Sequence, residues 1–164
     1  MRPSYFAAAV LFVVGLHAGA ASAEVDGSLA HRSADLTREY LHTWSTNARA
    51  ALADVPRLYA PRVSFSGRML GHDALIREKA QFVRRWPARR YSHRPGTMRV
   101  ACNTQSRRCI VRSVIDWQAA NAARGMFSSG SSTFEQGVDL AAARPLVFRE
   151  NGSVISQRRT RARG

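Results

Sequence analysis

The hydrophobic period of this chain changes at Pro87, and that change limits the folds that the chain can adopt. Before Pro87, apolar residues recur at helical spacing, as Leu36, Tyr40 and Trp44 do. After Pro87, apolar and polar residues alternate over long runs, which is typical of half-buried strands. Helices followed by strands, rather than an alternation of the two, indicate an α+β domain.

Three helices and one short strand are predicted in the first half of the chain. Each helix has an apolar face and begins near a polar residue that can cap it. The strand is predicted from Val63 and Phe65, which alternate with polar neighbours as far as about Met69. The helices are expected from Ser33 to about Ser45, from Thr46 to Pro61, and from Ala74 to Arg85 after a cap at His72 or Asp73.

A long antiparallel sheet is predicted in the second half. Asn151-Gly152 is a strong hairpin signal between its last two strands. The run of small residues from Ser128 to Ser132 predicts a bend or a close approach by another backbone, such as that of a dimer partner. The strands are expected at Tyr91 to Cys102, Cys109 to Ala119, Met126 to Leu140, Leu146 to Arg149 and Ser153 to Gln157.

The two cysteines, Cys102 and Cys109, fix the expected register of this sheet. We expect one disulfide between them, worth about 2–3 kcal/mol, because no second cysteine pair or histidine cluster suggests a metal site. Cysteines directly opposite each other on paired strands place Arg99 against Arg112, and the next hairpin brings Glu135 beside Arg112.

The same register separates an inward face from an outward face. Asp116 falls outward, where we expect a surface ion pair unless a bulge turns it to the inward face. The inward positions are apolar or amide side chains: Val111, Ile115, Trp117, Phe134, Gln136 and Val138.

The N-terminus has the layout of a cleaved secretory signal. A positive end precedes an apolar run, Tyr5 to Leu16, which is short for a membrane span, and Ala21-Ser22-Ala23 is a small-x-small site. We therefore expect cleavage after Ala23, a periplasmic or secreted protein, and no transmembrane segment in the mature chain. The expected organisation is a signal peptide (1–23), a flexible lead (24–32), one domain (33–157) and a basic tail (158–164).

The net charge of +14 comes almost entirely from arginine, since Lys79 is the only lysine. In an exported protein this charge predicts attraction to anionic envelope components rather than to nucleic acid. The densest arginine cluster is interleaved with Trp86 and Tyr91. This pattern predicts either a surface that binds anions or the positively charged C-terminus of a helix. Its arginines are Arg84, Arg85, Arg89, Arg90 and Arg94.

The run GRMLGHDALIREKAQFVRRWPARRYSHRPGTMRVAC, followed by CIVRSVIDWQ and SGSSTFEQGVDL, resembles the nuclear transport factor 2-like superfamily. This superfamily is also called cystatin-like or SnoaL-like, and the likeness is to its small secreted bacterial members. The resemblance implies an α+β cone of three N-terminal helices packed in a curved antiparallel sheet. It also implies a pocket at the open end and frequent homodimers through the sheet. Such relatives include isomerases, dehydratases, cyclases, epoxide hydrolases and non-catalytic binding domains, so the fold does not choose a function.

The inward positions predict a pocket for a small, partly apolar ligand. For chemistry, Tyr40 could donate a hydrogen bond, while His93 or Asp116 could act as a base. A buried Lys79 would be a functional candidate, although lysine stems more often pack along a core with the ammonium in water. The expected pocket residues are Tyr40, Trp44, Phe65, Phe82, Trp86, Trp117, Phe134 and Gln136.

Three functions remain open on the sequence. The first is an exported, non-catalytic binding or accessory domain. The second is a small isomerase, dehydratase or cyclase that uses the cone as its active site, and the third is a basic adhesion or scaffold protein of the envelope. None of them calls for a cofactor or a metal.

Overall fold

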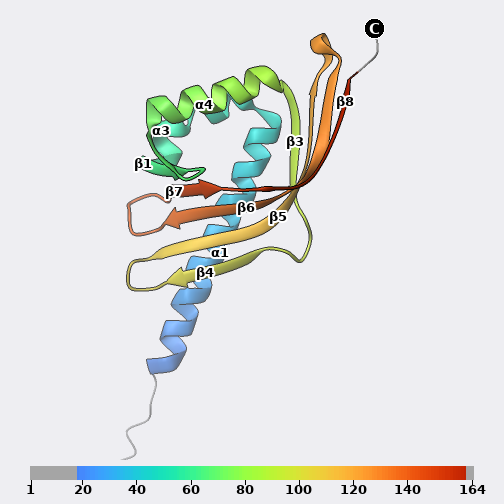
Figure 1. Ribbon diagram of the computed structural model, residues 1–164. Coiled ribbons are helices and arrows are strands. Elements are labelled where there is room, and N and C mark those ends of the chain that lie inside the picture. The colour runs from blue at the N-terminus through green and yellow to red at the C-terminus, as the bar shows by residue number, and fades with distance from the viewer. Residues whose placement is uncertain (1–17, 162–164) are drawn as a thin grey trace, which may run out of the picture.

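The computed structural model describes residues 18–161, with side chains from Gly27 onward, as helices cradled by one bent sheet (Figure 1). The helices are α1 (Ala18–Thr46), α2 (Ala48–Ala53), α3 (Val55–Leu58) and α4 (His72–Arg85), with a 3₁₀ turn at Ala122–Arg124. The strands are β1 (Tyr59–Phe65), β2 (Arg68–Gly71), β3 (Ala88–His93), β4 (Arg99–Asn103), β5 (Arg108–Asn121), β6 (Met126–Asp139), β7 (Leu146–Asn151) and β8 (Val154–Arg161).

Helix α1 is longer than predicted, because residues 24–32 continue the helix instead of forming a loose lead. Leu29 explains the extension: it is buried and packs near the Cys102–Cys109 bridge at the end of the sheet. Ser33 is a buried residue inside the helix rather than its cap. The predicted cleavage site falls within the first turns of α1, whereas residues 1–17 of the predicted signal lie outside the described residues.

The predicted second helix is two short helices, α2 and α3. Asn47 caps α2 by accepting a hydrogen bond from the Ala50 amide, and Pro56 lies in the first turn of α3. Helix α4 lies close to its predicted range, but Gly71 is at its N-cap position. The His72 imidazole instead lies 3.1 and 3.0 Å from the carbonyl oxygens of Tyr59 and Ala60.

The predicted single strand around Val63 is a hairpin of β1 and β2. Ser66 and Gly67 both have positive φ, 48° and 78°, as tight hairpin turns of the primed type require. Strand β1 also pairs with β7 in parallel, so the sheet is mixed rather than purely antiparallel.

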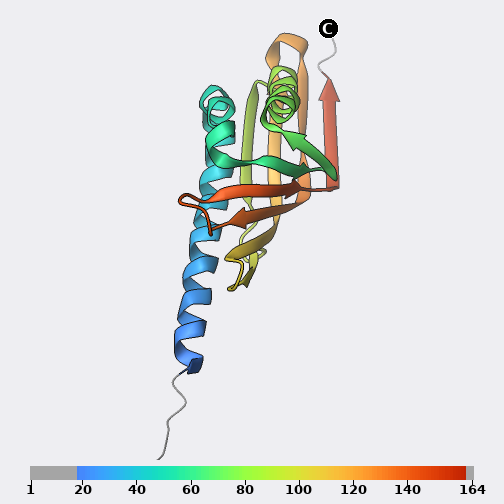
Figure 2. The same ribbon diagram turned by 90° about the vertical axis from the view of Figure 1, so that its left-hand side faces the viewer.

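Strands β5 and β6 run the whole length of the sheet and bend in the middle. Strands β4 and β3 pair with successive halves of β5, and β7 and β8 pair with successive halves of β6. Figures 1 and 2 show the result: one half of the sheet runs beneath the helices, and the other turns up beside α4. The concave side of this bend faces α1 and α4.

The predicted hairpin at Asn151-Gly152 is wrong. Strands β7 and β8 both lie antiparallel to β6, so the chain keeps its direction through a kink at residues 151–153. Glycine is needed there because a Cβ on Gly152 would lie 2.5 Å from the Thr133 carbonyl oxygen. The predicted basic tail likewise continues as strand β8 as far as Arg161.

The predicted register of β4, β5 and β6 is confirmed. Cys102 and Cys109 are directly opposite and form a disulfide, with 4.0 Å between their Cα atoms. Arg99 pairs with Arg112, and Arg112 pairs with Glu135, whose carboxylate accepts a 2.7 Å hydrogen bond from the Arg112 Nε. The acid on the outer face thus offsets the repulsion between the two arginines.

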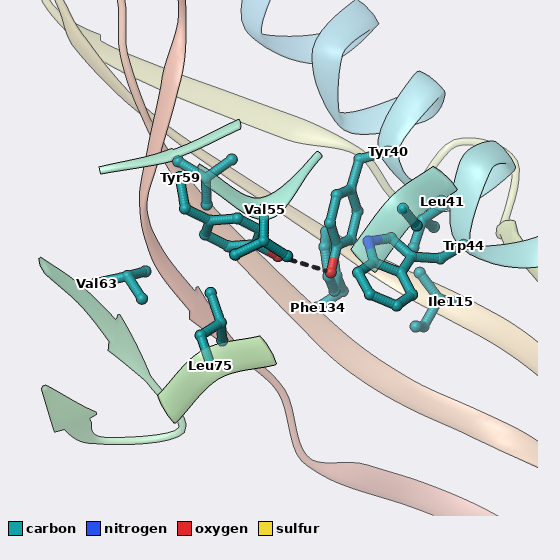
Figure 3. Close-up of a cluster of buried hydrophobic side chains, with 11 residues drawn as sticks. Tyr40, Leu41, Trp44, Val55, Tyr59, Val63, Leu75, Ile115 and Phe134 are labelled. Carbon is teal, nitrogen blue, oxygen red and sulfur yellow. Dashed lines mark hydrogen bonds between the residues drawn. The ribbon is translucent and has the colours of Figure 1, made fainter. Parts of the chain in front are cut away.

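The core fills the concave side of the sheet between α1, α3 and α4 (Figure 3). Its aromatic members surround Tyr40, whose ring stacks on Phe134 at 6.0 Å and meets Tyr59 edge-on at 6.4 Å. The predicted α+β cone is therefore confirmed, with a mixed sheet and more helical segments than expected. Within residues 18–161 no helix combines the length and the hydropathy that a bilayer crossing requires.

Candidate functional site

A cavity of about 400 Å³ opens on the concave side of the sheet, at its bend. Its lining includes two exposed side chains, Phe82 of α4 and Val154 of β8, which are 46% and 62% exposed, and the buried Tyr40 and Lys79. Six of its 18 lining residues are aromatic: Tyr40, Trp44, Phe65, Phe82, Tyr91 and Phe134.

Lys79 reaches the cavity wall from α4 and is only 7% exposed. Its ammonium lies over four aromatic rings, 4.7 Å from the centroid of Trp44, 4.9 Å from Phe65, and 5.4 Å from both Tyr40 and Tyr59. Cation–π attraction of this kind grows stronger where water is excluded. The prediction that the lysine stem packs while its ammonium reaches bulk water is therefore wrong.

Glu150, near the end of β7, supplies the counter-charge. Its two carboxylate oxygens lie 2.9 and 3.1 Å from the Lys79 Nζ, and both side chains are largely buried. Such a pair compensates two desolvation penalties at once, and removal of either partner leaves a buried charge.

Two tyrosine hydroxyls complete a ring of hydrogen bonds. The Lys79 ammonium donates to the Tyr40 hydroxyl at 2.8 Å, and the Tyr59 hydroxyl lies 3.1 Å from that of Tyr40. Figure 3 marks the hydrogen bond between the two tyrosines with a dashed line. The Tyr59 hydroxyl also donates to Glu150. Because each hydroxyl carries one proton, all four groups are satisfied when Tyr40 donates to Tyr59 and Tyr59 donates to Glu150.

Burial sets the protonation tendencies of this quartet. Desolvation lowers the pKa of Lys79, and the Glu150 carboxylate opposes that shift. Desolvation, with the Glu150 charge as the second cause, raises the pKa of Tyr40 and of Tyr59 well above the ordinary value. The tyrosines are therefore protonated donors at neutral pH, and the lysine gives up its proton more readily than an exposed one does.

Four elements distant in sequence bring the quartet together. Tyr40 and Trp44 lie one turn apart on α1, while Lys79 shares the inward side of α4 with Leu75. Tyr59 begins β1, and the parallel pairing of β1 with β7 carries Glu150 to it across 91 residues.

Sequence reasoning missed Tyr59 and Glu150. Tyr59 was predicted to lie on the apolar face of a helix, and Glu150 was predicted to lie beside a hairpin turn. The signal that could have found the site is Lys79 itself, a lone lysine on an apolar helix face that calls for a buried acid.

The cavity brings together five of the eight residues expected in the pocket: Tyr40, Trp44, Phe65, Phe82 and Phe134. The other three lie elsewhere. Trp86 ends α4 beneath the Arg85 guanidinium, and Trp117 pairs with Tyr91 and Gly130 farther along the sheet. Gln136 is fully buried under α1, where it accepts a 2.8 Å hydrogen bond from the Thr37 hydroxyl.

The two candidate bases suggested with Tyr40 do not join it. Asp116 lies on the outer face, as the register predicts, and pairs with Arg94 at 2.6 Å, which lowers the pKa of the carboxyl. His93 is half-buried behind Phe134, with its Nδ1 2.8 Å from the Ser113 hydroxyl, and burial lowers its pKa. Neither side chain lines the cavity, whose two lining carboxylates are Glu150 of the quartet and Glu78, which pairs with Arg68 at 2.7 Å. Glu150 is the buried one of the two, so it is the better candidate base.

The arginine cluster is divided by the fold. Arg89 is buried and donates to the carbonyl oxygens of Trp86 and Trp44, so it ties the end of α4 to α1. Arg94 is held by Asp116, whereas Arg84, Arg85 and Arg90 are exposed. Binding of anions by this surface stays a prediction, as does a homodimer through the sheet. Among the described side chains, no three His, Cys, Asp or Glu residues gather in a way that could hold a metal ion.

No family model and no curated protein matches this chain in sequence. Solved structures match it in shape. A scytalone dehydratase-like protein of Novosphingobium aromaticivorans superposes with a TM-score of 0.69 and 10% identity, over 86% of this chain and 93% of that protein. An aromatic ring hydroxylase-like protein of the same organism gives 0.63 and 15%, over 80% and 92%.

A third match is an uncharacterised protein with a cystatin-like fold from Caulobacter vibrioides, at a TM-score of 0.61 and 11% identity, over 79% of this chain and 90% of that one. At such identities the likeness concerns the fold and carries no function. Together with the helices cradled by a bent sheet, it shows that this chain has the cystatin-like, nuclear transport factor 2-like cone fold.

Proposed function

We propose that the cone binds a small, largely aromatic carbonyl compound and catalyses proton transfer beside its carbonyl group, as isomerases, dehydratases and cyclases do. The observation that supports this most is the buried Lys79–Glu150 pair, hydrogen-bonded to Tyr40, in the wall of an aromatic cavity. The cavity volume of about 400 Å³ falls in the range of about 300–1,000 Å³ that small-molecule sites occupy.

The quartet offers a distinct role for each group. The Lys79 ammonium and the Tyr40 hydroxyl can donate to a ligand oxygen as negative charge develops on it, and such preoriented donors act strongly where water is excluded. The Glu150 carboxylate is the base that takes the proton from the neighbouring carbon. Tyr59, which donates to Glu150, orients that carboxylate.

A simple apolar binding pocket would not need these charges. Well-packed hydrophobic residues in place of a buried ion pair are often neutral or stabilising, so the pair favours a chemical role over a structural one. The fold is shared with a dehydratase-like protein, which agrees with proton-transfer chemistry on a small ligand. The sequence alone leaves a non-catalytic binding domain open, and an exchange experiment separates the two functions.

The test is hydrogen–deuterium exchange of 2-tetralone, an aromatic ketone with exchangeable protons beside its carbonyl group. The protein in D₂O should accelerate deuterium uptake, followed by NMR, and the ketone should raise the melting temperature. Glu150→Gln should slow the exchange about 100-fold while keeping the shape of the side chain. Glu135→Gln, on the outer face, is the matched control and should exchange at the unsubstituted rate.

Binding without accelerated exchange would replace this proposal by the non-catalytic binding role. A protein that neither binds the ketone nor accelerates its exchange would contradict the proposal altogether.

We also propose that the protein works outside the cytoplasm. The disulfide between Cys102 and Cys109 suits an oxidising compartment, and the N-terminal signal layout provides the route. Expression of the full chain in a bacterium should yield a periplasmic protein whose intact mass lacks residues 1–23. A full-length product in the cytoplasm would contradict export.

A further inference from the structure

The single lysine of this chain stands where an arginine could not do the same chemistry. The chain has 25 lysine and arginine residues, and Lys79 is the only lysine among them. Arginine stays protonated in proteins, whereas a lysine that loses its proton becomes a nucleophilic amine. This amine lies in the wall of the aromatic cavity rather than on the surface.

We propose that Lys79 is a nucleophile that forms an imine with the carbonyl carbon of a small aromatic aldehyde or ketone bound in the cavity. This inference rests on the proposed function and deepens it, since it names the bond through which the ligand is activated.

The surroundings of the Nζ meet the requirements of such a step. The ammonium is held in an apolar site by four rings, and the nearest base, Glu150, is 2.9 Å away. The Tyr40 hydroxyl, 2.8 Å away, can pass a proton to an oxygen that develops beside the nitrogen. The lowered pKa of Lys79 increases its neutral share at working pH.

The step balances without an outside reagent. The ammonium gives one proton to Glu150, and the amine lone pair attacks the carbonyl carbon, so that a C–N bond forms. One proton then moves from the nitrogen to the ligand oxygen through Tyr40. Glu150 returns its proton to the resulting hydroxyl, the C–O bond breaks, and water leaves. The products are a protonated imine and an ionised Glu150, with the charge that the site began with.

The site that holds the ammonium also suits this product. The protonated imine keeps a positive charge at the same nitrogen, over the rings and beside the ionised Glu150. Because that charge acidifies the neighbouring C–H bond, the ionised Glu150 can then remove the proton that the proposed function requires.

Two measurements on the unsubstituted protein test the inference directly. Sodium cyanoborohydride added with 2-tetralone should reduce the imine and leave one stable adduct per chain on Lys79, located by peptide mass spectrometry. The only competing amine in the chain is the N-terminus, because there is no second lysine. In ¹⁸O-labelled water the ketone should also gain the label faster with protein than without it, because imine formation releases the carbonyl oxygen as water.

Lys79→Arg keeps the positive charge and should abolish both the adduct and the label uptake. Lys79→Arg combined with Arg90→Lys moves the single lysine to an exposed position on β3. The adduct yield on this lysine should not exceed the yield on a free amine in solution. An adduct of equal yield on this surface lysine would overturn the inference, as would its absence from Lys79 in the unsubstituted protein.

The outcomes also separate the two proposals. Accelerated deuterium exchange with no adduct and no ¹⁸O uptake would overturn the imine and leave the proposed function standing, with Lys79 acting through its charge. A protein that neither binds 2-tetralone nor accelerates its exchange, and yields no adduct, would overturn both.

Discussion

At the scale of single residues, the Lys79 ammonium and the Glu150 carboxylate are each other's main compensation for burial. Their side chains are 8% and 13% exposed, and the lysine makes hydrogen bonds to Tyr40 as well as to the acid. Among the residues that the structure describes, neither charge forms a second salt bridge. The energetic value of each residue therefore depends on the presence of the other.

We expect this dependence to appear in a double-mutant cycle of unfolding free energies. Lys79→Met and Glu150→Met should each destabilise the protein by about 3 kcal/mol, because each leaves a buried group without its partner. The double variant should lose clearly less than the sum, since Tyr40 and Tyr59 can still bond to each other and the charges are gone together. Urea unfolding of the four proteins measures the coupling. Additive losses would mean that the two charges are compensated separately.

Only part of this site is predictable from residue patterns. Helical spacing puts Tyr40 and Trp44 on one face, and the strand register puts Phe134 inward, because both depend on neighbours in the sequence. Glu150 reaches Lys79 only because β1 and β7 pair in parallel, and no local sequence pattern predicts that pairing.

At the scale of elements, the disulfide made the register of β4, β5 and β6 predictable. The turns at the ends of β1 and β7 were predicted wrongly. Asn151-Gly152 has the composition of a tight hairpin, yet the chain runs on along β6 because the bend of the sheet needs a kink there. Ser66-Gly67 makes the tight turn instead. Turn composition alone cannot tell these cases apart, since glycine serves both positive φ and close approach.

The small residues of β6 are a second feature of this scale, and they accommodate β8. A Cβ on Gly130 would lie 2.0 Å from the Ser156 carbonyl oxygen, so the close approach foreseen for this run comes from the chain's own last strand. Gly130→Ala should push β8 away and destabilise the protein by about 1–3 kcal/mol. Amide hydrogen exchange should locate the loss in residues 154–161. Ser129→Ala, one residue away, is the control and should change stability by less than about 0.5 kcal/mol. Unchanged protection of β8 in Gly130→Ala would contradict this account.

At the scale of the whole molecule, α1 crosses the sheet and extends past its edge (Figures 1 and 2). The C-terminal half of α1 contributes Tyr40 to the main core, and its N-terminal half contributes Leu29 to the cluster around the disulfide. Leu29 is the first buried residue among the described side chains, which places the start of the folded domain before Ser33, the predicted boundary. Cleavage after Ala23 would therefore leave every described buried side chain in the mature protein.

Two truncations test where the domain begins. Removal of residues 1–23 should leave the unfolding free energy within about 0.5 kcal/mol of the full chain, since it takes away no described contact. Removal of residues 1–32 should lower it by about 2–4 kcal/mol, because Leu29 no longer covers Val138, Leu140 and the disulfide. Leu29→Ala in the shorter truncation is the matched variant, and it should reproduce most of that loss without shortening the helix. Equal stability of the two truncations would mean that the N-terminal half of α1 is not part of the folded domain, and that the boundary predicted from the sequence at Ser33 was the better one.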